Sequence, residues 1–77
     1  MNDEIRNKSR EFIQKAKKNG FAKDTIFICG TVAYSKEFIG REISVFQRFI
    51  ELLDKYPDEN KFLEVALTEC GVWGGAN

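Results

Sequence analysis

The 77-residue sequence carries twelve basic and twelve acidic side chains, no histidine and two cysteines, and 43% of its residues are hydrophobic. A chain so rich in apolar residues is expected to fold, and its length fits one helical domain spanning residues 1–77. The missing histidine excludes the commonest general base and metal sites of the Cys/His type, and the zero net charge gives no overall attraction to nucleic acid.

The first predicted element is an amphipathic helix that starts at Asn2 or Asp3, either of which can cap it, and stops at Asn19-Gly20. Its narrow apolar stripe consists of Ile5, Phe12, Ile13 and Ala16. A second stripe is basic and consists of Arg6, Arg10 and Lys17. The apolar stripe lets this helix join a bundle, and the basic stripe offers contacts to phosphates.

Residues 21–34 admit two interpretations. The run 25–29 is rich in β-branched and aromatic residues, which favours a strand, and Gly30 costs a helix about 1 kcal/mol relative to alanine. A strand needs a partner, however, and the rest of the chain has no second strand-like run. We therefore expect a short buried helix that Asp24 caps and that runs to Tyr34. The alternative is an α+β chain whose strand, at residues 25–34, pairs with the same strand of another copy.

The strongest pattern lies in residues 35–56, which predict a helix with two apolar seams. One seam consists of Ile39, Ile43, Phe46, Ile50 and Leu53, and the other of Phe38, Val45, Phe49, Leu52 and Tyr56. Two seams about 100° apart need two neighbours, so this helix is expected at the centre of a bundle or of a dimer. Ser35 is the expected cap and Pro57 the stop. Gly40 would indicate the close approach of another backbone, or simple tolerance.

A last helix is predicted from Asp58, which can cap it, to Gly71, which ends it. Glu59 adds favourable charge in its first turn. Residues 72–77 form an expected short flexible tail, in which Trp73 either reaches a partner or folds back on the end of the bundle. Together these elements predict an all-α fold, a small bundle of three or four helices around residues 35–56.

Neither a membrane nor a metal is expected. The first eleven residues are polar and charged, unlike a signal peptide, and the longest uncharged run, residues 25–35, is far too short to span a bilayer. Cys29 and Cys70 lie 41 positions apart in apolar surroundings, which predicts buried thiols rather than metal ligands. These features predict a cytoplasmic chain without cofactor or metal.

Catalytic motifs are missing from the sequence. It contains no Gly-x-Ser-x-Gly elbow, no Gly-x-x-x-x-Gly-Lys loop and no Gly-x-Gly-x-x-Gly fingerprint. Without histidine, every Ser-His and Cys-His nucleophile pair is excluded as well. We therefore expect no enzymatic activity.

The sequence favours a protein-binding function, in which apolar anchors supply affinity and charged rims select the partner. The side chains expected to bind the partner are Trp73, Phe49, Tyr56, Arg41 and Arg48. Since the chain has more apolar side chains than one small core hides easily, it is also expected to form a homodimer. A chain of this size without catalytic motifs suits a small phage or mobile-element inhibitor that covers the surface of a host machine such as a defence system.

Two other functional classes stay open. A DNA- or RNA-binding regulator would use Arg6, Arg10 and Lys17, since residues 1–23 carry seven basic and three acidic side chains, a net charge of +4. The same basic end can instead attract an acidic protein or be an ordinary solvated face. A small-ligand-binding oligomer would take a nucleotide in a pocket at the subunit boundary, lined by phenylalanines, Tyr34 and Arg41 or Arg48.

Overall fold

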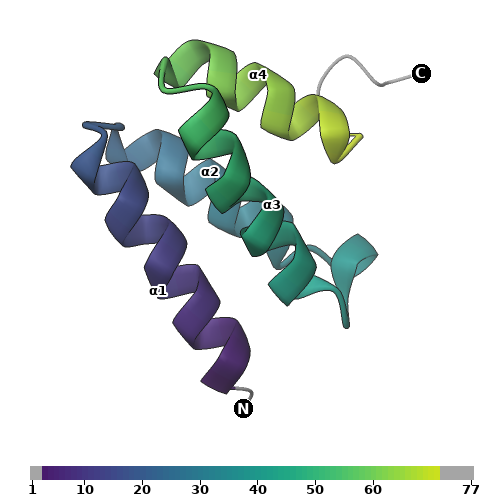
Figure 1. Ribbon diagram of the computed structural model, residues 1–77. Coiled ribbons are helices and arrows are strands. Elements are labelled where there is room, and N and C mark those ends of the chain that lie inside the picture. Colours follow the sequence, from purple (N-terminus) through teal and green to yellow (C-terminus); the bar gives the residue numbers. More distant parts are fainter. Residues whose placement is uncertain (1–2, 72–77) are drawn as a thin grey trace.

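The computed structural model describes residues 3–71, which form four α-helices, one short 3-10 helix and no strand (Figure 1). The elements are α1 (Asp3–Lys18), α2 (Lys23–Ala33), η1 (Lys36–Phe38), α3 (Glu42–Lys55) and α4 (Glu59–Glu69). The predicted all-α bundle is therefore confirmed, and the alternative with a strand at residues 25–34 is wrong. The expected tail, residues 72–77 with Trp73, lies outside the described residues.

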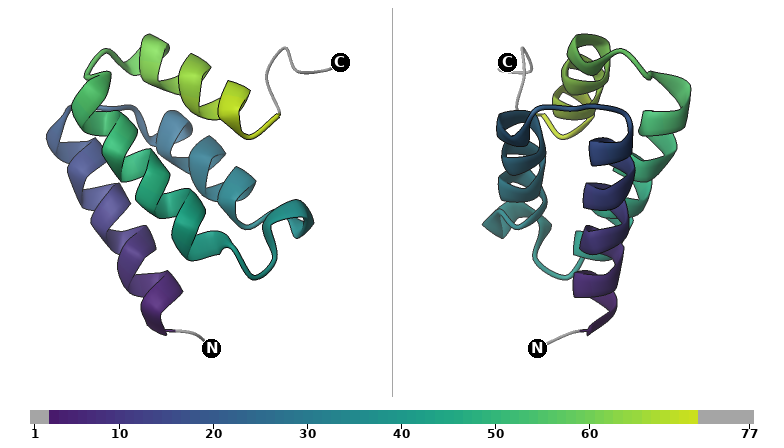
Figure 2. Two further views of the ribbon diagram at one scale, coloured as in Figure 1. Left: turned by 45° about the vertical axis from the view of Figure 1, so that its right-hand side comes forward. Right: turned by 90° about the vertical axis from the view of Figure 1, so that its left-hand side faces the viewer.

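Helix α3 occupies the central position that the two apolar seams predict. It runs beside α1 and also contacts α2 and α4, so it is covered from more than one direction (Figure 2). Helix α4 turns back at Pro57 and packs against α2 and α3. None of the helices in residues 3–71 combines the length and apolar character that crossing a membrane requires.

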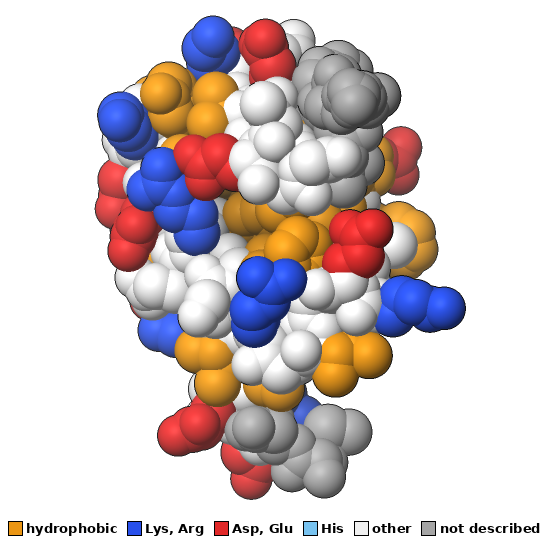
Figure 3. Space-filling model, turned by 90° about the vertical axis from the view of Figure 1, so that its right-hand side faces the viewer, with side chains coloured by type: hydrophobic (Ala, Val, Ile, Leu, Met, Phe, Trp, Pro, Cys, Tyr) orange, Lys and Arg blue, Asp and Glu red, His pale blue; other side chains and the backbone are white. Residues whose placement is uncertain are grey.

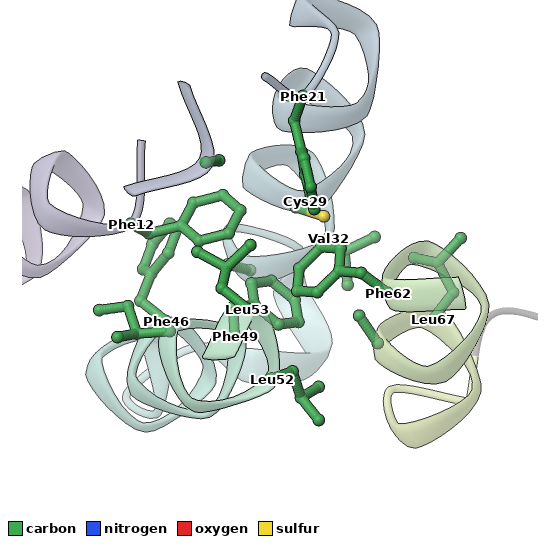
Figure 4. Close-up of a cluster of buried hydrophobic side chains, with 14 residues drawn as sticks. Phe12, Phe21, Cys29, Val32, Phe46, Phe49, Leu52, Leu53, Phe62 and Leu67 are labelled. Atoms are coloured by element: carbon green, nitrogen blue, oxygen red, sulfur yellow. The ribbon is translucent and has the colours of Figure 1, made fainter. Parts of the chain in front are cut away.

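A cluster of phenylalanines from different helices forms the core (Figure 4). The Phe12 ring of α1 lies 6.0 Å from Phe46, 5.6 Å from Phe49 and 6.2 Å from Phe62, measured between ring centroids. Phe21, in the turn after α1, adds a contact to Phe62 at 5.2 Å. Such tilted and stacked pairs stabilise a core beyond the area that they bury, so these rings join α1, α3 and α4 into one unit.

The helix predicted at residues 35–56 is in fact two elements separated by a turn. Gly40 has φ 86°, a left-handed conformation that interrupts the helix between η1 and α3. Neither predicted explanation for Gly40 holds: a Cβ at this position would meet no atom within 4 Å, so no other backbone approaches closely, and the positive φ makes the glycine a requirement of the turn instead of a tolerated residue. Ser35 precedes η1 without a side-chain cap hydrogen bond, and Ile39, expected in the first seam, is 73% exposed.

The N-terminus of α2 is capped by a residue from another helix. Asp24 lies inside the first turn, so the predicted cap is wrong. Instead the Glu59 carboxylate at the start of α4 accepts a hydrogen bond from the Ala22 backbone N–H (3.1 Å) and another from the Thr25 hydroxyl. A carboxylate at this helix end also complements the helix dipole, so the contact between α4 and α2 has a polar as well as an apolar component.

The predicted ends of α1 and α3 and the predicted start of α4 are confirmed, while the start of α1 at Asn2 borders on residues outside the described range. The Asp58 carboxylate caps α4 by accepting a hydrogen bond from the Lys61 N–H at 2.9 Å. Helix α3 ends at Lys55, two residues before Pro57. Gly20, with φ 85°, follows the end of α1. These signals act within a few residues of the chain, which is why the sequence alone was sufficient to predict them.

The phenylalanine core yields a first prediction. Replacing Phe12 by alanine is expected to lower the free energy of unfolding by about 3–5 kcal/mol, because it removes a fully buried ring and leaves a cavity. Phe27→Ala is the control, since Phe27 is 74% exposed and its truncation should change stability by about 0.5 kcal/mol at most. Urea unfolding followed by circular dichroism measures both, and equal effects of the two variants would contradict the assignment of the core.

Two glycines provide a matched pair for a second prediction. Gly40→Ala is expected to destabilise the protein by about 1–2 kcal/mol, because alanine pays a steric penalty at positive φ. Gly30→Ala, within α2 and also with open space around the added Cβ, is expected to stabilise it by about 0.5–1 kcal/mol. Thermal unfolding of both variants checks the opposite signs; a gain in stability for Gly40→Ala would exclude the turn.

Candidate functional site

Helix α2 buries its small side chains and exposes its large ones. The side chains on its inner face are Thr25, Cys29, Val32 and Ala33. On its outer face Phe27 is 74% exposed, Tyr34 at its C-terminal end 55% and Ile28 39%. Burial of a phenylalanine side chain stabilises a protein by about 2–3 kcal/mol. Because Phe27 is exposed, it does not contribute this amount to the stability of the isolated chain.

A groove lies beside this face, between α1 and α2, which lie side by side and are joined by one turn (Figure 2). We call it the α1–α2 groove; its volume is about 620 Å³. The residues that line it are Ser9, Ile13 and Lys17 of α1, with Lys23, Ile26, Phe27, Gly30, Thr31 and Tyr34 of or next to α2. The Tyr34 ring is anchored edge-on against the core ring of Phe46 at 5.5 Å, whereas the Phe27 ring points to solvent.

The cations of α1 divide into two groups. On the side of α3, Lys8 donates a hydrogen bond to Gln47 (2.9 Å) and Lys15 forms an ion pair with Asp54 (3.5 Å). On the groove side, Lys17 forms no ion pair with any residue in 3–71, and the same holds for Lys23 across the groove. Lys8 and Lys15 thus help to hold α1 against α3, whereas Lys17 and Lys23 keep ammonium groups without an ion-pair partner among the described residues beside the groove.

A smaller hollow lies between α3 and α4. The residues that line this α3–α4 hollow, of about 180 Å³, are Phe38, Arg41, Ser44, Val45, Arg48, Phe49, Glu69 and Cys70. Figure 3 shows this side of the molecule, with hydrophobic side chains gathered at the centre and charged side chains around them. Three of the predicted partner-binding residues, Arg41, Arg48 and Phe49, come together here.

The charged rim of the α3–α4 hollow is an ion pair within the protein. Arg48 donates two hydrogen bonds to the Glu69 carboxylate, from Nε and Nη2, each 2.8 Å long. This bidentate contact raises the pKa of Arg48 and holds the pKa of Glu69 below its ordinary value. Arg48 therefore ties α3 to α4, a structural role that the sequence did not predict.

The other predicted partner-binding residues are only partly suited to that role. Phe49 is 1% exposed and packs against Phe12 and Phe62, so the prediction that it contacts a partner is wrong. Its seam faces the protein's own core. Tyr56 is half-buried against the core at the far end of α3, and Arg41 lies over the Phe38 ring at 5.2 Å. Trp73 lies outside the described residues.

The predicted nucleic-acid stripe lies on one exposed side of α1. Arg6, Arg10 and Lys17 are all exposed, and Lys17 lines the α1–α2 groove, while Arg6 forms a 3.9 Å ion pair with Asp3. No group of three or more metal-ligating side chains occurs among the described residues. Burial raises the pKa of the Cys29 thiol to about 12, and the nearby Cys70 adds to the effect.

Sequence reasoning named Tyr34 as a pocket residue but missed Phe27 and Ile28, which share the outer face of α2 with it. The sequence does contain a sign of this face. Phe27 and Tyr34 are seven positions apart and therefore share one side of a helix, as do Lys23, four positions before Phe27, and Gly30, which lies between the two rings. The opposite face is also apolar, so the sequence pattern could not tell which side turns inward.

No protein-family model matches the chain, and the comparisons with curated proteins and with solved structures give no match either.

The Arg48–Glu69 pair predicts a dependence of stability on pH. Because the pKa of Glu69 is lowered from 4.5 in the folded protein, its stabilising contribution is present above pH 4.5 and is lost as the pH falls through the folded-state pKa. Arg48→Gln should therefore lower the urea midpoint at about pH 7. The difference from the unaltered protein should shrink in acid. A difference that stays constant down to about pH 3 would contradict the pair.

Proposed function

We propose that this chain is a non-enzymatic protein-binding module, whose contact surface is the outer face of α2 together with the α1–α2 groove. One observation carries the proposal: the largest side chain of α2, Phe27, is 74% exposed, while residues as small as Ala33 fill the inner face. An exposed aromatic side chain beside an apolar groove is typical of the anchors that dominate the affinity of protein interfaces.

The groove itself supports binding rather than catalysis. Its described lining offers hydroxyl groups, ammonium groups and apolar side chains, and no carboxylate or thiol. Such a lining holds a ligand by apolar contact and by positive charge. A protein that covers part of a partner's surface needs no more than this, so the mode of action that we propose is occlusion of that surface.

The two other predicted classes find less support. A nucleic acid would meet Lys17 and stack on the exposed rings. The residues predicted to line a nucleotide pocket lie in different hollows of one copy, because Tyr34 lines the α1–α2 groove while Arg41 and Arg48 line the α3–α4 hollow. The apolar floor of the groove, with Ile13 and Ile26, favours protein over both, because phosphates gain nothing from contact with it. The homodimer and the phage or mobile-element origin remain predictions.

A capture experiment with matched variants tests the proposal. Immobilised protein is exposed to a lysate of the source organism, and bound proteins are identified by mass spectrometry. The Phe27→Ser variant is expected to lose the partner. Ile39→Ser should retain it, since Ile39 is equally exposed (73%) but does not line the groove. Both variants should unfold at the urea midpoint of the unaltered protein. A partner that Phe27→Ser retains and Ile39→Ser loses would exclude this surface.

A further inference from the structure

We infer that the α1–α2 groove accepts an acidic amphipathic helix of the partner protein. This inference rests on the proposed function, and it specifies the chemistry of the segment that the groove recognises. It is carried by three properties of the groove, its length, its shape and its unpaired charges.

The length of the groove fits a short helix. Ser9, Ile13 and Lys17 lie four residues apart along α1, so they cover about 12 Å of its axis at 1.5 Å per residue. On the other wall, the lining from Lys23 to Tyr34 covers about 16 Å by the same measure. A guest helix of two to three turns has about this length, and a third helix laid on two neighbours is a recurrent mode of recognition.

The shape of the groove offers a place for one side chain of such a helix. Gly30 has no side chain, and a Cβ placed on it would meet no atom within 4 Å, so it leaves a notch in the wall of the groove. Phe27 lies one turn before this notch and Tyr34 one turn after it. A leucine or phenylalanine of the guest can therefore enter the notch between two aromatic rings, and the Phe27 ring can pack against the guest in turn.

The charges around the groove select an acidic guest. Lys17 and Lys23 line opposite walls, and Arg10 shares the Lys17 face of α1 at a spacing of seven. None of these three cations forms an ion pair within residues 3–71, and no carboxylate lines the groove. Carboxylates at the edges of an amphipathic helix would complement both rims.

A second copy of this chain is a poorer occupant. Acidic side chains next to apolar ones occur on α1, η1, α3 and α4. The apolar faces of α1, α3 and α4 already fill the core of their own copy, and η1, with three residues, is too short to occupy the groove as a helix. Helix α2 itself has a single acidic residue, Asp24, to offer to the cations of another copy. A homodimer through this face would therefore bring exposed apolar groups together but leave Lys17 and Lys23 without partners.

Peptide binding tests the inference. The probe is a fluorescein-labelled peptide of about 16 residues with leucine at positions i, i+3, i+4 and i+7 and glutamate at its polar positions. Fluorescence anisotropy is expected to show binding at least about tenfold tighter than that of the same peptide with lysine for glutamate, and a loss of affinity with added salt. A single-stranded oligonucleotide of about 12 thymidines is the third probe, and is expected to bind at least about tenfold more weakly.

Two variants locate the binding. Gly30→Leu fills the notch and, like Gly30→Ala, raises helix propensity, so it should weaken binding of the acidic peptide about tenfold or more without lowering the urea midpoint. Lys17→Glu combined with Lys23→Glu should also weaken binding of the acidic peptide about tenfold or more, because it reverses the charge of both rims. The control is Lys36→Glu with Lys55→Glu, which changes the net charge equally at exposed positions outside the groove and should bind the peptide normally.

Several outcomes would overturn the inference: no peptide binding, tighter binding of the lysine peptide or of the oligonucleotide, or a dimer that Phe27→Ser dissociates and that excludes the peptide. The inference can fail while the proposed function stands. If the partner captured from lysate is lost with Phe27→Ser but retained by the Lys17→Glu, Lys23→Glu variant, the surface binds a protein whose contacting segment is not acidic.

Discussion

The contact of Phe12 with three other phenylalanine rings is the interaction on which the rest of this structure depends. It joins α1 to α3 through Phe46 and Phe49, and to α4 through Phe62. A chain of 77 residues has little interior, and these four rings are among its largest fully buried side chains. Against this core α2 turns Thr25, Cys29, Val32 and Ala33 inward, which leaves Phe27 and Tyr34 at the surface.

The surface of the protein follows from this division. Side chains that hold helices together have partners within the chain, as Arg48 has in Glu69 and Lys15 in Asp54. Around the α1–α2 groove the opposite is true, because its cations form no ion pair within residues 3–71 and the Phe27 ring extends into solvent. Unused apolar and unused charged groups therefore occur together, and this coincidence is the reason for which we propose an interaction surface here instead of the ordinary exposure of single hydrophobic residues.

Sequence reasoning reached the helices whose ends carry local signals, such as Asp58, which caps α4 through the N–H of Lys61. It failed where a pattern has two physical readings. The seam spacing continues through Ile39, so periodicity alone did not reveal the left-handed turn at Gly40, although a glycine in a predicted helix was a warning. Phe49 was expected to meet a partner because a seam does not say whether its neighbour belongs to the same chain. The cap that Glu59 provides for α2 joins residues 37 positions apart, and no local rule contains it.

That remote cap has a consequence for how binding and folding are coupled. The Glu59 carboxylate of α4 holds the Ala22 N–H at the N-cap of α2 and the Thr25 hydroxyl in its first turn, so detachment of α4 would remove both hydrogen bonds from this end of α2. If a ligand binds α2 as we propose, it would favour the conformation in which α4 stays attached, because α2 contacts both. By reciprocity, any event that loosens the C-terminal helix would then reduce the affinity of the proposed site by the same factor. A single glutamate, Glu59, thus links the last helix to the helix that carries the proposed binding face.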